Sequence, residues 1–102
     1  MAYYRIGYEI ERKARKQLQE KGAKIVIRSA RSLTPIDLVA IFPEKHEIWL
    51  VQCKAKAEAP KKMETILKAF PDLARLAGTY TVKPHLYMKK QGKYQFIEVK
   101  PQ

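Results

Sequence analysis

The stretch PIDLVAIFPEKHEIWLVQCK, residues 35–54, predicts a β-hairpin. Residues 36–42 and 47–54 are rich in β-branched and other apolar side chains, which favour strands. The polar tetrapeptide PEKH between them begins with a turn-forming proline. A turn centred on this tetrapeptide places residues whose numbers sum to about 89 opposite each other in the two strands.

Three polar side chains lie at the open end of this predicted hairpin. The register sets Asp37 opposite Gln52. Because side chains alternate along a strand, Lys54 shares a face with Gln52, and Cys53 points the other way. A carboxylate, an amide and an ammonium group are therefore expected to meet at one end of the hairpin.

The composition predicts a single small domain, residues 1–102, that binds a polyanion. The chain is 46% hydrophobic and 30% charged, which suits one globular core. It carries 21 Lys and Arg residues against 10 Asp and Glu, a formal net charge of +11. Nucleic acid is the leading partner for a small protein this basic. The alternative is a basic surface that binds no polyanion.

Other features of the composition exclude several classes of protein. A single cysteine, Cys53, excludes an internal disulfide and a multi-cysteine zinc site. No apolar run approaches the ~18 residues of a membrane span. The first residues also lack the apolar core of a signal peptide. We therefore expect a cytoplasmic protein with no membrane partner.

An amphipathic helix is predicted over residues 4–21, because apolar residues recur at every fourth position. The apolar stripe consists of Ile6, Ile10, Ala14 and Leu18. Glu9 lies among basic residues and is interpreted as a surface partner of Lys13. Glu11 lies beside the stripe, where it either faces the sheet or pairs with Arg15. Spacing alone leaves both possibilities open.

The remaining elements complete an α/β fold. They are a strand at residues 24–28, a polar loop at 29–34, a helix at 63–77, one strand over 79–83 and 85–89 that is interrupted at position 84, and a last strand at 94–100. Gly22 is expected to end the first helix, and Pro71 to kink the second helix or divide it in two. Pro84 interrupts the strand pattern. The order α-β-β-β-α-β-β predicts a mixed central β-sheet flanked by helices.

The side chains at the hairpin end suit phosphodiester hydrolysis. This reaction uses a metal ion to activate water and to stabilise charge on the phosphate, and Mg²⁺ prefers oxygen ligands. Asp37 can supply a carboxylate, Gln52 an amide oxygen, and Lys54 a positive charge for the attacking water or the phosphate. Glu11 adds a second carboxylate if it faces inward. In the opposing interpretation, Asp37 caps a turn, and Gln52 and Lys54 form a solvated strand face.

Six short motifs carry a resemblance to a known family. They are YR-G-x-x-x-ER at residues 4–12, the helix end at 18–22, RSA-x-S at 28–32, IDLVA at 36–40, QCK at 52–54 and FIEV at 96–99. With these motifs the chain resembles the archaeal Holliday junction resolvases, members of the PD-(D/E)xK, restriction endonuclease-like superfamily. It is also similar to the Mrr-type restriction endonucleases, in which QxK replaces ExK.

The resemblance implies a Mg²⁺-dependent endonuclease, with Mn²⁺ able to substitute, that acts as a homodimer and resolves four-way DNA junctions. Glu11, and not Glu9, matches the metal-binding glutamate of the family's first helix, and Asp37 matches the metal-binding aspartate. Gln52 stands where the family has its second metal-binding carboxylate, and it is assigned to both the metal site and catalysis. The catalytic set implied by the resemblance is Lys54, Ser32 and Gln52.

Basic residues near these motifs are assigned to DNA contact, because Lys and Arg neutralise phosphates. They are Arg5, Arg12, Arg28, Arg31, Lys56, Lys61 and Lys62. The chain departs from the family at Gln52, which lacks the charge of glutamate, and at Arg31, where glycine is common. Two alternatives follow: a restriction- or repair-type endonuclease that cuts duplex DNA, and a catalytically weakened DNA-binding accessory protein.

Overall fold

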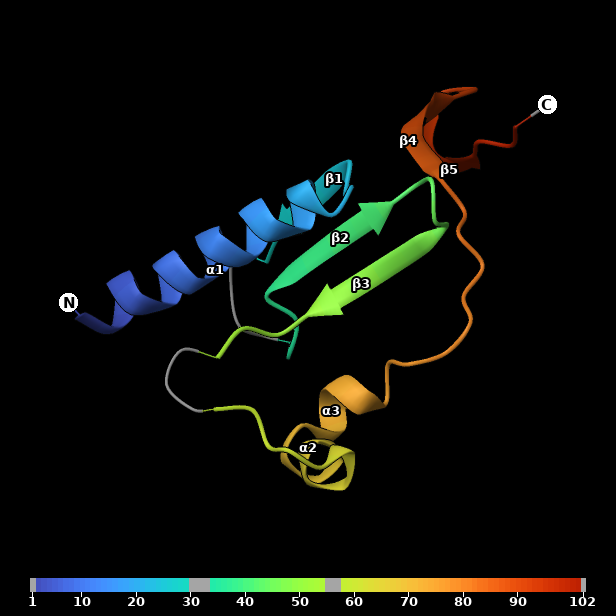
Figure 1. The fold of residues 1–102 in the computed structure, drawn as a ribbon. Coiled ribbons are helices and arrows are strands. Elements are labelled where there is room, and N and C mark those ends of the chain that lie inside the picture. The colour runs from blue at the N-terminus through green and yellow to red at the C-terminus, as the bar shows by residue number, and fades with distance from the viewer. Residues whose placement is uncertain (1, 30–33, 55–57, 102) are drawn as a thin grey trace.

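The computed structural model describes residues 2–29, 34–54 and 58–101, with the backbone alone for residues 2–7. The elements are α1 (Ala2–Glu20), β1 (Ile25–Arg28), β2 (Leu38–Phe42), β3 (Glu47–Val51), α2 (Met63–Ala69), α3 (Pro71–Ala74), β4 (His85–Lys90) and β5 (Lys93–Glu98). β1, β2 and β3 form one antiparallel sheet, and β4 and β5 form a second (Figure 1). No helix in the described ranges is long and apolar enough to cross a membrane.

The long helix α1 ends in a tight glycine turn, as expected. Gly22 has a φ of 110°, a left-handed conformation that a residue with a Cβ adopts at a cost. The N–H of Ala23 donates to the carbonyl of Leu18 at 3.0 Å, and the N–H of Gly22 donates to the carbonyl of Gln19 at 3.1 Å. These two bonds form a Schellman motif, which satisfies the last helical carbonyls and leads the chain into β1.

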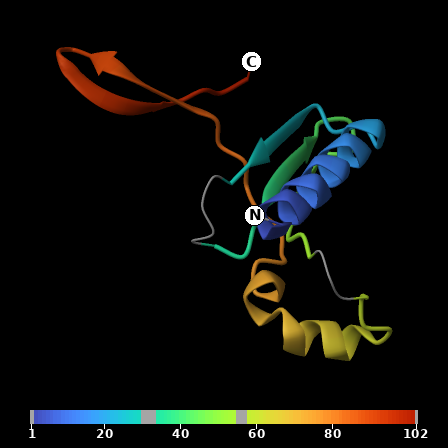
Figure 2. The same ribbon diagram turned by 90° about the vertical axis from the view of Figure 1, so that its left-hand side faces the viewer.

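The core lies between α1 and the three-stranded sheet. Alternate residues of β2, namely Leu38, Ala40 and Phe42, are buried against Leu18 of the helix. The aromatic ring of Trp49 on β3 extends this contact, with its centroid 4.6 Å from that of Phe42. Figure 2 shows α1 lying along this face of the sheet, which we call the helix face.

The hairpin has the predicted register. Leu38 pairs with Val51 and Phe42 with Glu47, so that the residue numbers of every pair sum to 89. The turn between the strands has His46 at a φ of 56°, and the N–H of His46 donates to the carbonyl of Pro43 at 3.3 Å. The ladder ends at the pair of Leu38 and Val51, and the N–H of Asp37 then donates to the carbonyl of Val51, so the expected pair of Asp37 and Gln52 lies beyond the observed ladder.

The other face of the sheet is aliphatic and is not covered by α1. It carries two cross-strand rows of three side chains each, which we call the open aliphatic face. The rows are Ile25–Ile41–Ile48 and Ile27–Val39–Leu50. Ile25, Ile27 and Ile48 are each close to half exposed.

The predicted second helix is divided at proline. α2 ends before Phe70, and Pro71 occupies the first turn of α3, where its missing N–H is not needed. The α/β class and the order of elements expected from the sequence are therefore confirmed, with two short helices in place of one kinked helix.

The expected strand at residues 79–83 is wrong, and the expected single mixed sheet is two antiparallel sheets. Residues 79–84 connect α3 to β4 without joining a ladder. Proline at position 84 has no N–H to donate, and β4 and β5 pair with each other instead. Gln91 and Gly92, with φ values of 54° and 83°, form the tight turn between them. Figure 2 shows this hairpin projecting away from the three-stranded sheet.

Replacement of Phe42 by alanine tests the core. Phe42 is 1% exposed and stacks on Trp49. We expect Phe42→Ala to lower the free energy of unfolding by about 3–5 kcal/mol, because it removes a large buried ring. Urea unfolding followed by the fluorescence of Trp49, the only tryptophan, measures it. The control Leu67→Ala, at a half-exposed position of α2, should change stability by less than about 1 kcal/mol; equal losses in both variants would contradict this core.

Candidate active site

Asp37 joins all three strands at one end of the sheet. The N–H of Ser29, just after β1, donates to the carbonyl of Asp37 at 2.9 Å, and the N–H of Asp37 donates to the carbonyl of Val51 at 2.8 Å. The N–H of Cys53 donates to Asp37 Oδ2 at 2.7 Å. The Asp37 carboxylate thus takes the place of a backbone carbonyl as the hydrogen-bond acceptor just after β3 ends. Its other oxygen, Oδ1, accepts no hydrogen bond within the described part of the chain.

Glu11 lies on the inner edge of α1, between the helix and β1. Its side chain is 21% exposed, and its Oε1 accepts a hydrogen bond from Arg28 Nε at 2.7 Å. The Arg28 guanidinium also lies 5.6 Å from the centre of the Tyr8 ring. Of the two possibilities left open by spacing, the structure therefore favours Glu11 facing the sheet over a pair with Arg15.

The pKa of the Cys53 thiol depends on the charges of both Asp37 and Glu11. Burial raises the pKa of the Cys53 thiol above its usual value, and the negative charges of Asp37 and then Glu11 raise this pKa further. Cys53 packs against the core on the helix face. Glu11 bonds to Arg28, the last residue of β1, and the next residue, Ser29, bonds to Asp37, so both acidic residues lie at the same end of the sheet.

Gln52 and Lys54 flank Cys53 along the chain. Gln52 is partly buried and follows Val51, the last residue of β3, whose carbonyl accepts the N–H of Asp37. Lys54 is exposed, and its Nζ lies 5.9 Å from the centre of the Phe70 ring, between α2 and α3. Among the described residues, no ion pair joins Lys54 to either carboxylate. The structure thus places Glu11 and Asp37 at the same end of the sheet, and it places the ammonium group of Lys54 toward the helices.

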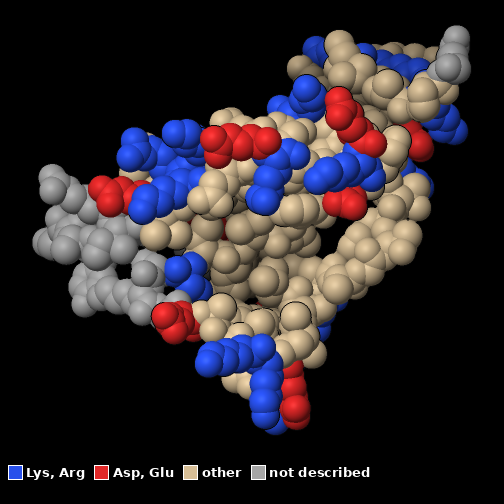
Figure 3. Space-filling model, in the orientation of Figure 1, with Lys and Arg blue, Asp and Glu red and all other residues tan. Residues whose placement is uncertain are grey.

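The basic residues assigned to DNA contact are only partly described. Arg12 is exposed on α1, Lys61 is exposed, and Lys62 is the residue before α2. Figure 3 shows Lys and Arg side chains gathered over α1, above a tan, hollowed centre. Ser32, Arg31 and Lys56 lie outside the described residues, as does the side chain of Arg5.

Two aromatic residues near the site were not predicted. Tyr8 lies under the Arg28 guanidinium, and Phe70 lies under the Lys54 ammonium. Tyr8 precedes Glu11 by three residues, so helical spacing could have placed both on one face. No signal of this kind links Phe70 to Lys54, because the two residues belong to separate elements.

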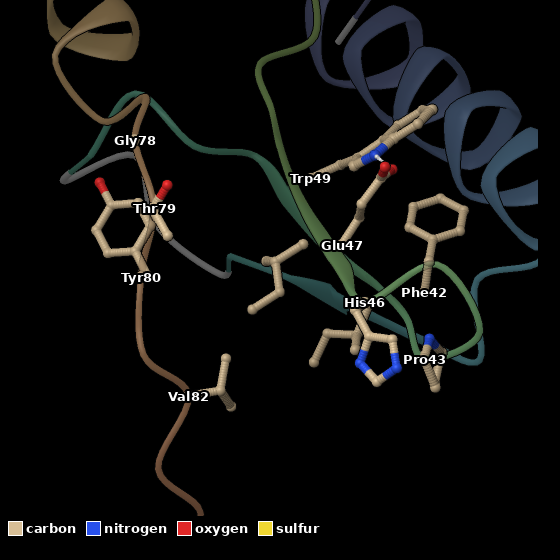
Figure 4. A pocket seen from close by; sticks show the side chains of 11 residues that line it. Phe42, Pro43, His46, Glu47, Trp49, Gly78, Thr79, Tyr80 and Val82 are labelled. Atoms are coloured by element: carbon tan, nitrogen blue, oxygen red, sulfur yellow. Dashed lines mark hydrogen bonds between the residues drawn. The ribbon is translucent and has the colours of Figure 1, made fainter.

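Two grooves lie away from this acidic site. The larger, about 780 Å³, lies at the turn end of the hairpin, between Phe42, Trp49 and the segment from Gly78 to Val82 (Figure 4). Its carboxylate, Glu47, already accepts a hydrogen bond from Trp49 Nε1 at 3.0 Å. The second, about 550 Å³, lies between the open aliphatic face and α3. Neither groove is lined by Glu11 or Asp37.

These features define a basic α/β protein with an acidic site at one end of an antiparallel sheet. The model of the archaeal Holliday junction resolvase family matches residues 2–101, nearly the whole chain, and the chain belongs to that family. Membership implies a nuclease that resolves Holliday junctions, with DNA as its partner. Neither the curated proteins nor the solved structures contain a match to the chain.

The reactivity of Cys53 tests the convergence of the two carboxylates. We expect Asp37→Asn and Glu11→Gln each to speed the reaction of Cys53 with a thiol reagent at pH 8, because loss of a nearby negative charge lowers the thiol pKa and raises the thiolate fraction. The control is Glu9→Gln, which removes the same charge from an exposed position on α1. Equal rates in all three variants and the wild type would show that the carboxylates lie apart.

Proposed function

We propose that this protein is a Mg²⁺-dependent endonuclease that nicks four-way DNA junctions and acts as a homodimer. The observation that carries the proposal is that Glu11, bonded to Arg28, and Asp37, bonded to Ser29, lie at the same end of the sheet in a chain of the junction resolvase family. Such a site, on a chain with a net charge of +11, suits a phosphodiester substrate.

The donor set fits a hard cation. Glu11 and Asp37 would hold the metal through carboxylate oxygens, and Gln52 would add an amide oxygen. The described residues hold no cluster of three or more His, Cys, Asp or Glu side chains suited to a metal. A site with few protein ligands suits Mg²⁺ or Mn²⁺, because Mg²⁺ keeps several waters and shares its ligands with the substrate phosphate. When bound, the metal supplies an activated water and charge stabilisation.

Neighbouring groups of the chain hold Asp37 and Glu11 in position. The N–H of Cys53 holds the Asp37 carboxylate in place, and Arg28 neutralises Glu11 while no cation is bound. Arg28 is 46% exposed, so that its guanidinium can turn from Glu11 to a DNA phosphate. Lys54 can leave Phe70 at little cost, since an exposed cation–π contact contributes only about 0.5–1 kcal/mol. Its ammonium group would then stabilise charge on the phosphate.

Gln52 supports a second candidate function. An amide oxygen carries no full charge, so the site has one negative charge fewer than it would have with glutamate. A protein with this deficit can bind junctions and cut them slowly or not at all, as a DNA-binding accessory protein does.

Cleavage of a labelled four-way junction tests these two functions. We expect wild-type protein with Mg²⁺ to nick the junction, and Asp37→Ala to lower the rate by about 100-fold or more while leaving junction affinity within a few fold, because it removes a metal ligand and no DNA contact. Gln52→Glu should raise the rate or the Mg²⁺ affinity. A linear duplex of the same sequence is the control substrate. Equal cutting by wild type and Asp37→Ala would contradict the proposed site.

The open aliphatic face supports the homodimer. The accessible surface of the chain is 9398 Å², whereas a compact protein of this mass exposes about 5,900 Å². The radius of gyration is 17.1 Å, against about 13 Å for a compact domain of this length. Six aliphatic side chains in two rows are a suitable surface for a second copy, because burial of apolar area is the main driving force of association.

Sedimentation tests the homodimer. We expect wild-type protein to have about twice the chain mass of 11.9 kDa, and Ile27→Lys to shift it toward the monomer, because the lysine puts a charge into one of the two aliphatic rows. Gln19→Lys, which adds the same charge on exposed α1, should remain a dimer. Trp49 fluorescence checks that both variants are folded. An unchanged mass for Ile27→Lys would place the interface elsewhere.

A further inference from the structure

The β4–β5 hairpin has an exposed aromatic face. Tyr87 pairs with Phe96 across the two strands, and their ring centres lie 4.7 Å apart. Tyr94 lies 5.5 Å from Tyr87 in a stacked arrangement, and His85 lies 6.4 Å from Phe96. Phe96 is 75% exposed, and Tyr87 and Tyr94 are also well exposed. We call these four rings the aromatic face of the hairpin.

The hairpin that carries the aromatic face is basic, and one of its lysines lies on that face. Residues 83–100 contain five lysines and one acidic residue. The ammonium group of Lys89 lies 5.6 Å from the centre of the Tyr94 ring, on the same face. Lys90 and Lys93 pair beside the turn, and strand alternation puts their side chains on the opposite face. The acidic residue, Glu98, pairs with His85 at the end away from the turn.

Exposed aromatic rings beside lysine favour nucleic acid over another protein as the partner of this face. The buried centre of a protein–protein interface is depleted in lysine, which argues against a second copy of this chain on the aromatic face. Single-stranded nucleic acid, in contrast, is bound by aromatic rings that stack on bases and by cationic side chains that follow the phosphates. The opposite face of the hairpin carries Leu86, Met88 and Ile97 and no aromatic ring.

We propose that the aromatic face of the β4–β5 hairpin binds unpaired nucleobases of DNA by stacking. The proposal rests on the proposed function for the nature of the substrate, and it adds a second contact that is separate from the acidic site. Tyr87 and Phe96 form the stacking platform, and Lys89, on the same face, contacts the adjacent phosphate. Through this contact the protein would favour branched DNA whose branch point exposes unpaired bases over a fully paired junction.

Binding of a fluorescein-labelled twelve-nucleotide oligo(dT) by the full chain tests the proposal. The buffer contains EDTA, so that the measurement does not depend on the metal or on cleavage. We expect Phe96→Leu to weaken binding by about fivefold or more, since stacking of one base contributes about 1–3 kcal/mol. Phe96→Trp should retain wild-type affinity, because it keeps an aromatic ring. Leu86→Ala, on the opposite face, is the matched control.

Each outcome decides the matter. Loss of affinity in Phe96→Leu, with affinity retained in Phe96→Trp and Leu86→Ala, supports stacking. Equal affinity in Phe96→Leu and the wild type overturns the stacking proposal. An equal loss in Phe96→Leu and Leu86→Ala also overturns it, because binding would then need only an intact hairpin. A change of sedimented mass in Phe96→Leu without loss of oligo(dT) affinity would make the face a protein interface and would also overturn it. Cleavage of a fully paired junction is measured separately, so that a failure of the proposed function is seen independently.

Discussion

The structure depends on the set of hydrogen bonds around Asp37. Its backbone bonds to the chain after β1 and to the end of β3, and its carboxylate accepts the N–H of Cys53. A carboxylate that accepts a backbone N–H bond is fixed in position. The same residue therefore closes the end of the sheet and presents a charged oxygen there. α1 adds Glu11 at this end because its Schellman turn and its contact with the helix face hold it along the sheet.

Much of this arrangement could be predicted from the sequence, because its determinants are local. The turn residues and the alternation of apolar side chains define the hairpin register, and the register brings Asp37 to the end of β3. The helical stripe predicts which side of α1 faces the sheet, and Glu11 lies beside it. The direction of Lys54 could not be predicted in this way. β3 ends at Val51, so strand alternation no longer governs a side chain three residues later, and the nearby ring of Phe70 comes from a distant element.

The C-terminal part shows a second limit of sequence patterns. The sequence TYTV at residues 79–82 has the alternation that is typical of a strand. A strand also needs a neighbouring strand whose backbone N–H and C=O groups are free to pair, and the pattern does not show whether one is near. The two-residue turn at Gln91 and Gly92 instead pairs β4 with β5, which removes both from the first sheet. An isolated two-stranded hairpin is only marginally stable in water. The open aliphatic face and the exposed hairpin together leave much apolar surface in contact with solvent.

The central claim is that Glu11 and Asp37 together hold the metal at the end of the hairpin. The most direct test is anomalous diffraction from crystals of the full chain with a four-way junction and Mn²⁺. The account predicts an anomalous peak about 2.1 Å from carboxylate oxygens of both residues, with the Arg28 guanidinium moved from Glu11. An ordered Mn²⁺ peak bound to the junction phosphate without contact to Asp37 or Glu11 would contradict it.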